Sequence, residues 1–221
     1  MQQLLLDVKI KKAGDYLAED FLPLANSFSA HRIALSALSN ELTGCLIMGP
    51  KGVGKTHLYH LCQQYTNSNE VEFLALDDIA QLQMPTAEIK YLFIDNINSL
   101  TQEQQELLFH WYNHLKDKGG KMVLVLEKTL DELVTLKDLK SRLLTLQQAV
   151  IESPNDKDLE IFISKQAFDR QVEINADVLS YMILRIERNF AKVEALIEKI
   201  DDESLREKRK ITVPFVKEFL D

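Results

Sequence analysis

The sequence predicts an α/β fold in which a five-stranded parallel sheet is flanked by helices and followed by a small all-helical domain. Up to about residue 152, five short apolar runs alternate with longer segments of helical period. Such alternation is typical of parallel strands that are covered by helices on both faces. After Ser153-Pro154 the strand-like runs cease, and only helical patterns follow. We therefore expect a tail at residues 1–12, an α/β domain at 13–152 and a helical domain at 153–221.

The strand candidates are residues 45–48, 71–76, 91–94, 122–126 and 149–151. Two of the helices between them have recognisable starts, because Thr101 with Gln104 and Thr129 with Glu132 fit a capping box. Gly119-Gly120 is a suitable end for the first of these two helices.

The C-terminal domain shows four segments of helical period. They are residues 156–168, 176–186, 191–200 and 214–220. Asn175 and Thr212 directly precede two of them and are expected to be N-caps.

The overall composition excludes several classes of protein. The net charge of the 221 residues is −8, which disfavours a stand-alone, sequence-specific DNA binder, since phosphate contacts need clustered Lys and Arg. Cys45 and Cys62 lie in apolar or helical patterns and are interpreted as buried free thiols without zinc-site spacing. No signal-peptide pattern and no apolar stretch of about 18 residues is present, so we expect a cytoplasmic protein without a membrane partner.

The clearest motif follows the first strand candidate. The eight residues of G-x-x-x-x-G-K-[ST] are Gly49, Pro50, Lys51, Gly52, Val53, Gly54, Lys55 and Thr56. Glycines let several backbone N–H groups face one anion, and the following helix adds its positive dipole end. Lys55 is expected to contact the β- and γ-phosphates of ATP or ADP, and the Thr56 hydroxyl to bind Mg²⁺. The alternative is a glycine-rich turn followed by a chance Lys-Thr pair.

A carboxylate at the end of a second strand completes this prediction. Four apolar residues at 91–94 are followed by Asp95, which is expected to hold Mg²⁺ through water, although a plain turn residue is the alternative. In hydrolysing P-loop enzymes a second acid usually follows and orients the attacking water. Here Asn96 takes that place, and its amide cannot accept a proton at neutral pH. We therefore predict good nucleotide binding and slow intrinsic hydrolysis.

Three strings occur in one order: GKTHL at 54–58, LFIDNI at 92–97 and DLKSRL at 138–143. Together they resemble the AAA+ P-loop NTPase module of the DnaA/Hda-type family, over residues 15–221. The resemblance implies that the helical domain is a lid, that Phe21 and Leu22 lie near the adenine and that His57 lies beside the P-loop. Packing of the first helix onto the sheet is an equal alternative for Phe21 and Leu22.

The helix-turn-helix domain with which DnaA reads DNA has no counterpart in this sequence, which makes it similar to the Hda branch of the family. That resemblance implies a regulator that binds ADP, docks on the sliding clamp of DNA polymerase III and stimulates ATP hydrolysis by DnaA. Such a protein limits re-initiation of chromosome replication and works in the cytoplasm at the nucleoid and replisome. ADP or ATP as the bound nucleotide, and a homo-oligomer, both remain open.

Two further segments match the family's motifs. Gln3, Leu4 and Leu6 are similar to its clamp-binding peptide, in which alternate apolar side chains enter a groove, although Asp7 departs from the pattern. The alternative is that residues 4–6 pair with a sheet edge or are disordered. Arg142 matches the arginine finger that stabilises the transition state in a neighbouring molecule. Its alternative is a surface ion pair with Asp138.

Other family positions are altered. The lid arginine that contacts phosphate aligns with Ala191, while Arg188 lies about one turn away. The polar residue expected after the fourth strand has Glu127 as its only candidate. Together with Asn96, these changes predict a protein that retains its nucleotide rather than an active ATPase. The alternatives from other classes are an ATPase that loads or remodels a replication factor, in the manner of a helicase loader, and a small P-loop kinase.

Overall fold

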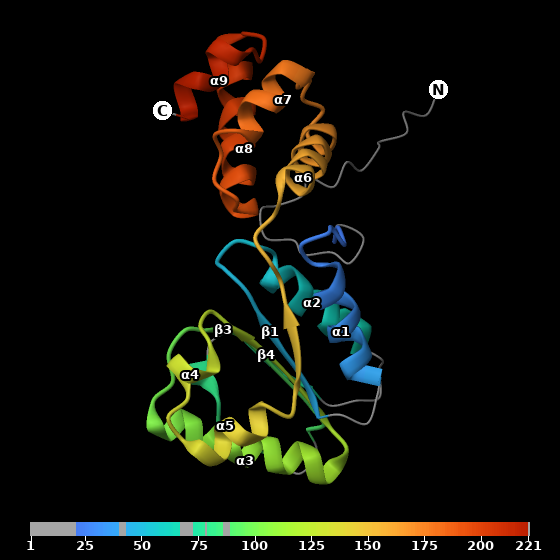
Figure 1. The fold of residues 1–221 in the computed structure, drawn as a ribbon, viewed down its shortest axis with the longest axis vertical. Helices are drawn as coiled ribbons and strands as arrows, with labels where there is room; N and C mark the ends of the chain where they lie inside the picture. Colours follow the sequence, from blue (N-terminus) through green and yellow to red (C-terminus); the bar gives the residue numbers. More distant parts are fainter. Residues whose placement is uncertain (1–20, 40–42, 67–72, 78, 86–88, 221) are drawn as a thin grey trace, which may run out of the picture.

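The computed structural model of this chain describes residues 21–39, 43–66, 73–77, 79–85 and 89–220, and the side chains of 73–76 are excluded from that description. The described part consists of an α/β domain and a helical lid at one end of it (Figure 1). None of the described helices is long and apolar enough to span a membrane.

One parallel sheet forms the centre of the α/β domain. Its strands are β1 (Gly44–Met48), β2 (Phe73–Leu76), β3 (Tyr91–Ile97), β4 (Lys121–Leu126) and β5 (Gln147–Val150). The strands pair in the order β2-β3-β4-β1-β5, and every pairing is parallel. This confirms the predicted five-stranded parallel sheet.

Several strand boundaries differ from those predicted, and the differences at β3 and β5 have a common cause. Strand β5 begins two residues earlier than residue 149 and ends at Val150, because its register with β1 pairs Cys45 with Gln147 and Met48 with Val150. Strand β3 continues past Ile94 to Ile97 through a register shift against β4. Polar residues at both places conceal the true ends, since hydrogen bonding of the backbone defines a strand and apolar pattern only suggests it.

Helices cover both faces of the sheet, as the continuous apolar runs require. On one side lie α1 (Phe28–Ser39) and α2 (Lys55–Thr66); on the other lie α3 (Gln102–Lys118), α4 (Leu130–Leu133) and α5 (Lys137–Leu143), as Figure 1 shows. A short 3-10 helix spans Ile79–Gln81. Within β1, Leu46 packs into the core beneath α3, whereas Cys45 and Ile47 pack into the core beneath α1 and α2.

The ends of α3 confirm the sequence prediction. The Thr101 side chain accepts a hydrogen bond from the N–H of Gln104, whose own side chain accepts one from the N–H of Thr101. Gly119 ends the helix in the left-handed region, with φ of 65°. At α4, both the N–H and the hydroxyl of Thr129 donate to the Glu132 carboxylate.

Both cysteines are fully buried free thiols, as predicted. Burial raises the pKa of Cys45 to about 12 and raises that of Cys62 well above its ordinary value, with a smaller contribution from Cys45. Both side chains therefore act as small apolar groups between β1 and α2.

The lid has its own hydrophobic core. Its helices are α6 (Asp156–Asp169), α7 (Ala176–Ile183), α8 (Phe190–Glu207) and α9 (Val213–Leu220). Asn175 caps α7 by accepting from the N–H of Val178, as predicted. Helix α8 extends seven residues beyond the expected end at residue 200, and the acidic run Asp201-Asp202-Glu203, of which only Asp202 is fully exposed, lies within the helix rather than at its end. Thr212 precedes α9, and its carbonyl accepts from the N–H of Val216.

A candidate nucleotide site at the P-loop

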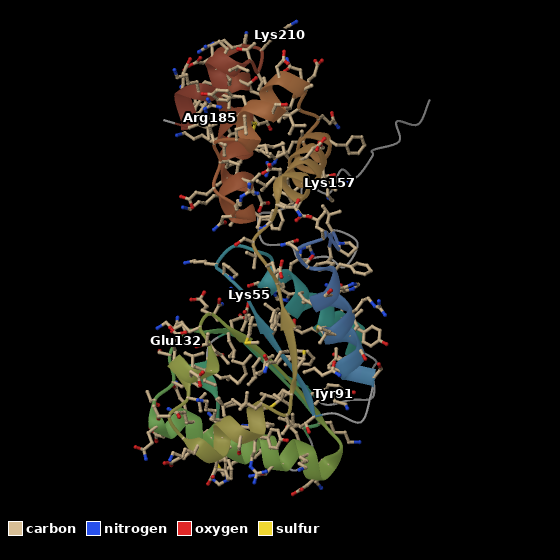
Figure 2. All side chains as sticks on the ribbon, viewed as in Figure 1. Lys55, Tyr91, Glu132, Lys157, Arg185 and Lys210 are labelled. Atoms are coloured by element: carbon tan, nitrogen blue, oxygen red, sulfur yellow. The ribbon has the colours of Figure 1, made fainter. Side chains whose placement is uncertain are left out.

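The predicted phosphate loop joins the carboxyl end of β1 to the first turn of α2. Lys55 is the first residue of α2, and its side chain is only 7% exposed. Its Nζ donates to the carbonyl oxygens of Gly49 and Pro50, both at 2.9 Å. Figure 2 shows Lys55 at the end of the α/β domain that faces the lid. The Lys55 ammonium group therefore lies against the backbone at the start of the phosphate loop.

Two of the loop glycines have conformations that other residues resist. Gly49 has a φ of 150°, and a Cβ there would lie 2.3 Å from the carbonyl oxygen of Ile151. Gly52 has a φ of 76°, and a Cβ there would lie 2.1 Å from the Asn189 side-chain oxygen. The first glycine lets the loop pass β5, and the second lets the lid approach the loop.

Asp95 lies within β3 rather than directly after its end, which corrects the sequence prediction. The register shift between Ile94 and Ile97 bends the strand at this point. Asp95 is 2% exposed, and its Oδ1 accepts from the N–H of Asn96 at 2.8 Å. Asn96 has a φ of 56° and an exposed side chain. Asn tolerates the left-handed region better than most residues, so the type of residue fits the bend.

Charge at the loop is concentrated around Lys55. Burial lowers the pKa of Lys55, while the carboxylates of Glu127 and Asp95 oppose that shift, in that order of size, and Lys51 adds to it. Both carboxylates therefore favour the charged form of the ammonium group. The backbone N–H of Glu127 donates to the carbonyl of Ile97, which fixes the residue at the end of β4.

A magnesium ion would find suitable ligands here. The Thr56 hydroxyl and the Asp95 carboxylate are hard oxygen donors, and Mg²⁺ at phosphate sites typically keeps several waters and takes only one or two protein ligands. No cluster of three or more His, Cys, Asp or Glu side chains suited to a metal exists in the described part of the chain. The donor set therefore fits an ion shared with phosphate oxygens, in which case it would neutralise charge on those oxygens.

The predicted adenine contacts lie beside the P-loop helix. The Phe21 ring is 5.2 Å from the His57 ring and 5.2 Å from the His31 ring, centroid to centroid. Leu22 is half-buried next to it. Burial lowers the pKa of His31. Phe21 packs against the core beneath α1 and α2. Its ring also lies against His57, the residue that follows Thr56.

The segment before α1 also meets the connection to the lid, which sequence reasoning missed. Asn26 is 7% exposed, and its side-chain Nδ2 donates to the carbonyl of Glu152, while its backbone carbonyl accepts from the N–H of Glu152. The N–H of Ala25 donates to the carboxylate of Asp158 in α6. A lone Asn before a helix carries no pattern that reveals such long-range partners.

The lid contacts the P-loop through the start of α8. The Asn189 Nδ2 donates to the carbonyl of Lys51 at 3.0 Å, and the N–H of Phe190 donates to the carbonyl of Gly52 at 2.8 Å. Ala191 follows within the same turn and brings no charge. Arg188 points elsewhere, because its guanidinium donates to the carbonyl of Pro154 and the carboxylate of Asp156. Asn189 was not singled out from the sequence, where it resembles a simple N-cap.

Arg142 lies on α5, at the opposite edge of the sheet from the P-loop. The P-loop follows the carboxyl end of β1, whereas Arg142 precedes the amino end of β5, and these strands are parallel neighbours. Its guanidinium lies over the Phe109 ring at 4.8 Å and the Tyr112 ring at 5.6 Å. Stacking on α3 therefore replaces the ion pair with Asp138 that was the alternative. The residues of the clamp-binding prediction, Gln3, Leu4 and Leu6, lie outside the described part of the chain.

Comparison with known proteins agrees with this architecture. Residues 24–155, more than half of the chain, match the family model described as the sigma-54 interaction domain. Residues 156–220 match the model described as the Hda lid domain.

Curated relatives include the chromosomal replication initiator protein DnaA of Borrelia turicatae, 26% identical over 208 residues, and that of Borrelia hermsii, 27% identical over 208 residues. Each alignment covers 84% of this chain and 43% of the relative, so the chain spans less than half the length of these relatives.

Solved structures show the same fold. Domain III of the Thermotoga maritima replication initiation protein DnaA superposes with a TM-score of 0.75 at 19% identity, over 95% of this chain and 98% of that one. AMPPCP-bound DnaA from Aquifex aeolicus gives a TM-score of 0.71 at 20% identity, over 89% of this chain and 69% of that one. The chain belongs to the sigma-54 interaction domain family of P-loop modules and, through its lid and its curated relatives, to the DnaA/Hda-type AAA+ proteins.

Proposed function

We propose that this chain is a regulatory AAA+ protein that retains an adenine nucleotide, ADP with Mg²⁺, and stimulates ATP hydrolysis by DnaA. The observation that carries the proposal is that the Lys55 ammonium group and the Arg142 guanidinium lie at opposite ends of the parallel strands. Lys55 lies at the carboxyl edge of the sheet and Arg142 lies beyond the amino edge. An arginine at that place serves the nucleotide of another molecule and not the one at its own P-loop.

Several features support retention of nucleotide. The match to the Hda lid model and the adenine-nucleotide analogue bound by the Aquifex aeolicus relative both favour an adenine nucleotide. Phe21 lies against His57 near the start of α2, and Asn26, in the same segment as Phe21, bonds to Glu152, so this segment is available to a base beside the P-loop. Lys55 and the backbone amides of Gly49 to Thr56 would bind the phosphates, while Thr56 and Asp95 would hold the ion.

Slow hydrolysis follows from the residues around Asp95 and the lid. Asn96 is exposed, and its amide is no general base. At the start of α8, Ala191 leaves the lid without the arginine that would contact phosphate. The chain therefore keeps the binding parts of the module and lacks two groups that promote cleavage.

One observation favours an active ATPase that loads or remodels a replication factor. The Glu127 carboxylate lies close enough to Lys55 to oppose the shift in its pKa, and a carboxylate at this place could orient water. We favour the regulator because the attraction of Glu127 for the Lys55 ammonium group needs no role in water activation.

Single-turnover hydrolysis separates these two functions. We expect the protein alone, loaded with ATP and Mg²⁺, to hydrolyse it no faster than ATP-bound DnaA does by itself. Added to ATP-bound DnaA with clamp-loaded DNA, it should accelerate conversion to ADP by at least about 10³-fold, the lower range for an arginine finger. The measurement is radiolabelled ADP formed on DnaA over time. Rapid hydrolysis by the protein alone, with no effect on DnaA, would establish the rival function.

Clamp docking is proposed for the N-terminal segment. Changing Gln3 and Leu6 together to alanine should abolish capture on immobilised sliding clamp, since the glutamine amide and alternate leucines supply the specific contacts. Leu5→Ala is the matched control, because neighbouring side chains of an extended peptide point in opposite directions. Surface plasmon resonance gives both affinities. Equal binding by the double variant and the wild type would contradict the docking proposal and leave nucleotide binding untouched.

A further inference from the structure

We propose that Asn189 is a positioning residue through which the lid sets the orientation of two phosphate-binding amides in the P-loop. The two hydrogen bonds concerned, from Asn189 Nδ2 to the Lys51 carbonyl and from the Phe190 N–H to the Gly52 carbonyl, are called here the lid–loop contact. The inference rests on the proposed nucleotide binding and goes beyond it, because it assigns a role to a lid residue whose side chain bonds to the backbone of the loop.

The argument begins with the geometry of the peptide unit. Peptide bonds of the described residues are trans, and a trans peptide is planar, with its C=O and N–H pointing in opposite directions. The Lys51 carbonyl belongs to the same plane as the N–H of Gly52, and the Gly52 carbonyl to the same plane as the N–H of Val53. Fixing these two carbonyls from the lid side therefore fixes two N–H groups on the other side of the loop.

Those N–H groups belong to the segment whose amides surround a polyphosphate in this motif. Glycine makes the backbone here soft, and Gly52 already has a φ of 76°. Without an external restraint, the loop would lose conformational freedom only when phosphate binds, which lowers affinity. The lid–loop contact supplies that restraint before phosphate binds. Part of the loss of conformational entropy in the loop therefore occurs when the lid folds and no longer lowers the affinity for phosphate.

The packing at this point is close enough to make the contact specific. A Cβ on Gly52 would lie 2.1 Å from the Asn189 Oδ1 and 2.5 Å from its Nδ2. The same Asn189 amide group accepts from the N–H of Lys192 and so caps α8, which orients the Nδ2 towards Lys51. One side chain therefore joins the start of the longest lid helix to the phosphate loop.

Coupling between two sites is reciprocal. If the lid–loop contact orients the amides for phosphate, bound phosphate must in turn stabilise the lid–loop contact. Bound ADP should therefore favour one position of the lid without a charged lid residue at Ala191. This offers a physical reason why a chain with alanine there can still sense its nucleotide.

Asn189→Ser tests the contact. Serine is a good N-cap, so α8 keeps its cap, but the short hydroxyl cannot replace the amide donor to Lys51. We expect the Kd for Mg-ADP, measured by calorimetry, to rise about fivefold, the net value of one hydrogen bond. Asn175→Ser is the matched control, since Asn175 caps α7 by the same kind of bond, in which its side-chain oxygen accepts from the N–H of Val178 within the lid. Its Kd should equal that of the wild type.

A second measurement needs no variant. Amide hydrogen exchange at Phe190, followed by NMR, should slow when ADP is added to the wild-type protein, and this protection should be weaker in Asn189→Ser. The inference would be overturned by an unchanged Kd for Mg-ADP in Asn189→Ser or by an equal rise of that Kd in Asn175→Ser. It would also be overturned if the exchange rate of the Phe190 amide were the same with and without ADP. Failure of wild-type protein to bind ADP would instead overturn the proposed function.

Discussion

Replacement of Lys55 by alanine is expected to raise the Kd for Mg-ADP by about 10- to 100-fold, the range for loss of charge-assisted hydrogen bonds. The Lys55 Nζ already lies at the mouth of the loop, where it donates to two loop carbonyls. Phosphate oxygens would exchange with these carbonyls as acceptors and would relieve the unfavourable burial that lowers the pKa of Lys55. Calorimetric titration with ADP and Mg²⁺ gives the change directly.

The same substitution should leave the fold intact. Lys55 contributes a buried charge whose desolvation opposes folding, so its loss removes a cost along with two hydrogen bonds. At a hundredfold excess over Kd, ADP should stabilise the wild type by about 2.7 kcal/mol, which corresponds to a rise in Tm of roughly 5–10 °C for a chain of this size. With a Kd raised 10- to 100-fold, Lys55→Ala at the same ADP concentration should keep only about 0.4–1.4 kcal/mol of this stabilisation, and its rise in Tm should shrink in proportion.

The matched control is Lys210→Ala. Figure 2 shows Lys210 at the far end of the lid from Lys55, and its side chain is exposed. Both variants lose one positive charge, so a general effect of net charge would appear in both. Tight ADP binding by Lys55→Ala would mean that the loop is a glycine-rich turn and would remove the basis of the proposed function.

Replacement of Arg142 by alanine is expected to return DnaA to its unstimulated rate of ATP hydrolysis. An arginine finger is worth about 10³- to 10⁵-fold in rate because its guanidinium stabilises charge that develops on the transferred phosphoryl group. Single-turnover formation of ADP on DnaA, with saturating amounts of this protein, measures the loss. Binding of ADP at the protein's own P-loop should not change, because Arg142 lies at the opposite edge of the sheet.

The fold should tolerate this substitution. The half-buried Arg142 stacks on Phe109 and Tyr112, a cation–π contact worth about 0.5–2 kcal/mol. Arg142→Lys should be nearly as defective in stimulation, since the ammonium group lacks the planar fork that binds phosphoryl oxygens in pairs. A lysine variant with full activity would show that only positive charge is needed.

Arg185→Ala serves as the control for loss of a stacked arginine. The Arg185 guanidinium lies 3.9 Å above the Tyr181 ring, in the lid. Figure 2 shows it far from the α/β domain. This variant should stimulate DnaA as the wild type does. Full stimulation by Arg142→Ala would instead rule out the finger and show that another group of this protein promotes hydrolysis on DnaA.

Much of the fold was predictable because its signals are local. Apolar runs placed all five strands, and capping residues such as Thr101 and Asn175 marked helix starts, since each depends on neighbours within a few residues. The predicted strand ends were wrong where polar residues continue a strand. Asp95 and Asn96 seemed to end β3, yet the backbone carries on to Ile97 through a bulge.

The candidate site was likewise predictable only where its signals are local. The sequence by itself determined the P-loop, Asp95 and the substitutions at Asn96 and Ala191, because each is a residue type at a fixed spacing from a motif. Only the tertiary structure decided that Asn189 bonds to Lys51, 138 positions away, that Asn26 meets Glu152, and that Arg142 stacks on α3. Contacts of this kind depend on how separately formed elements pack, and no short-range pattern of residues records that arrangement.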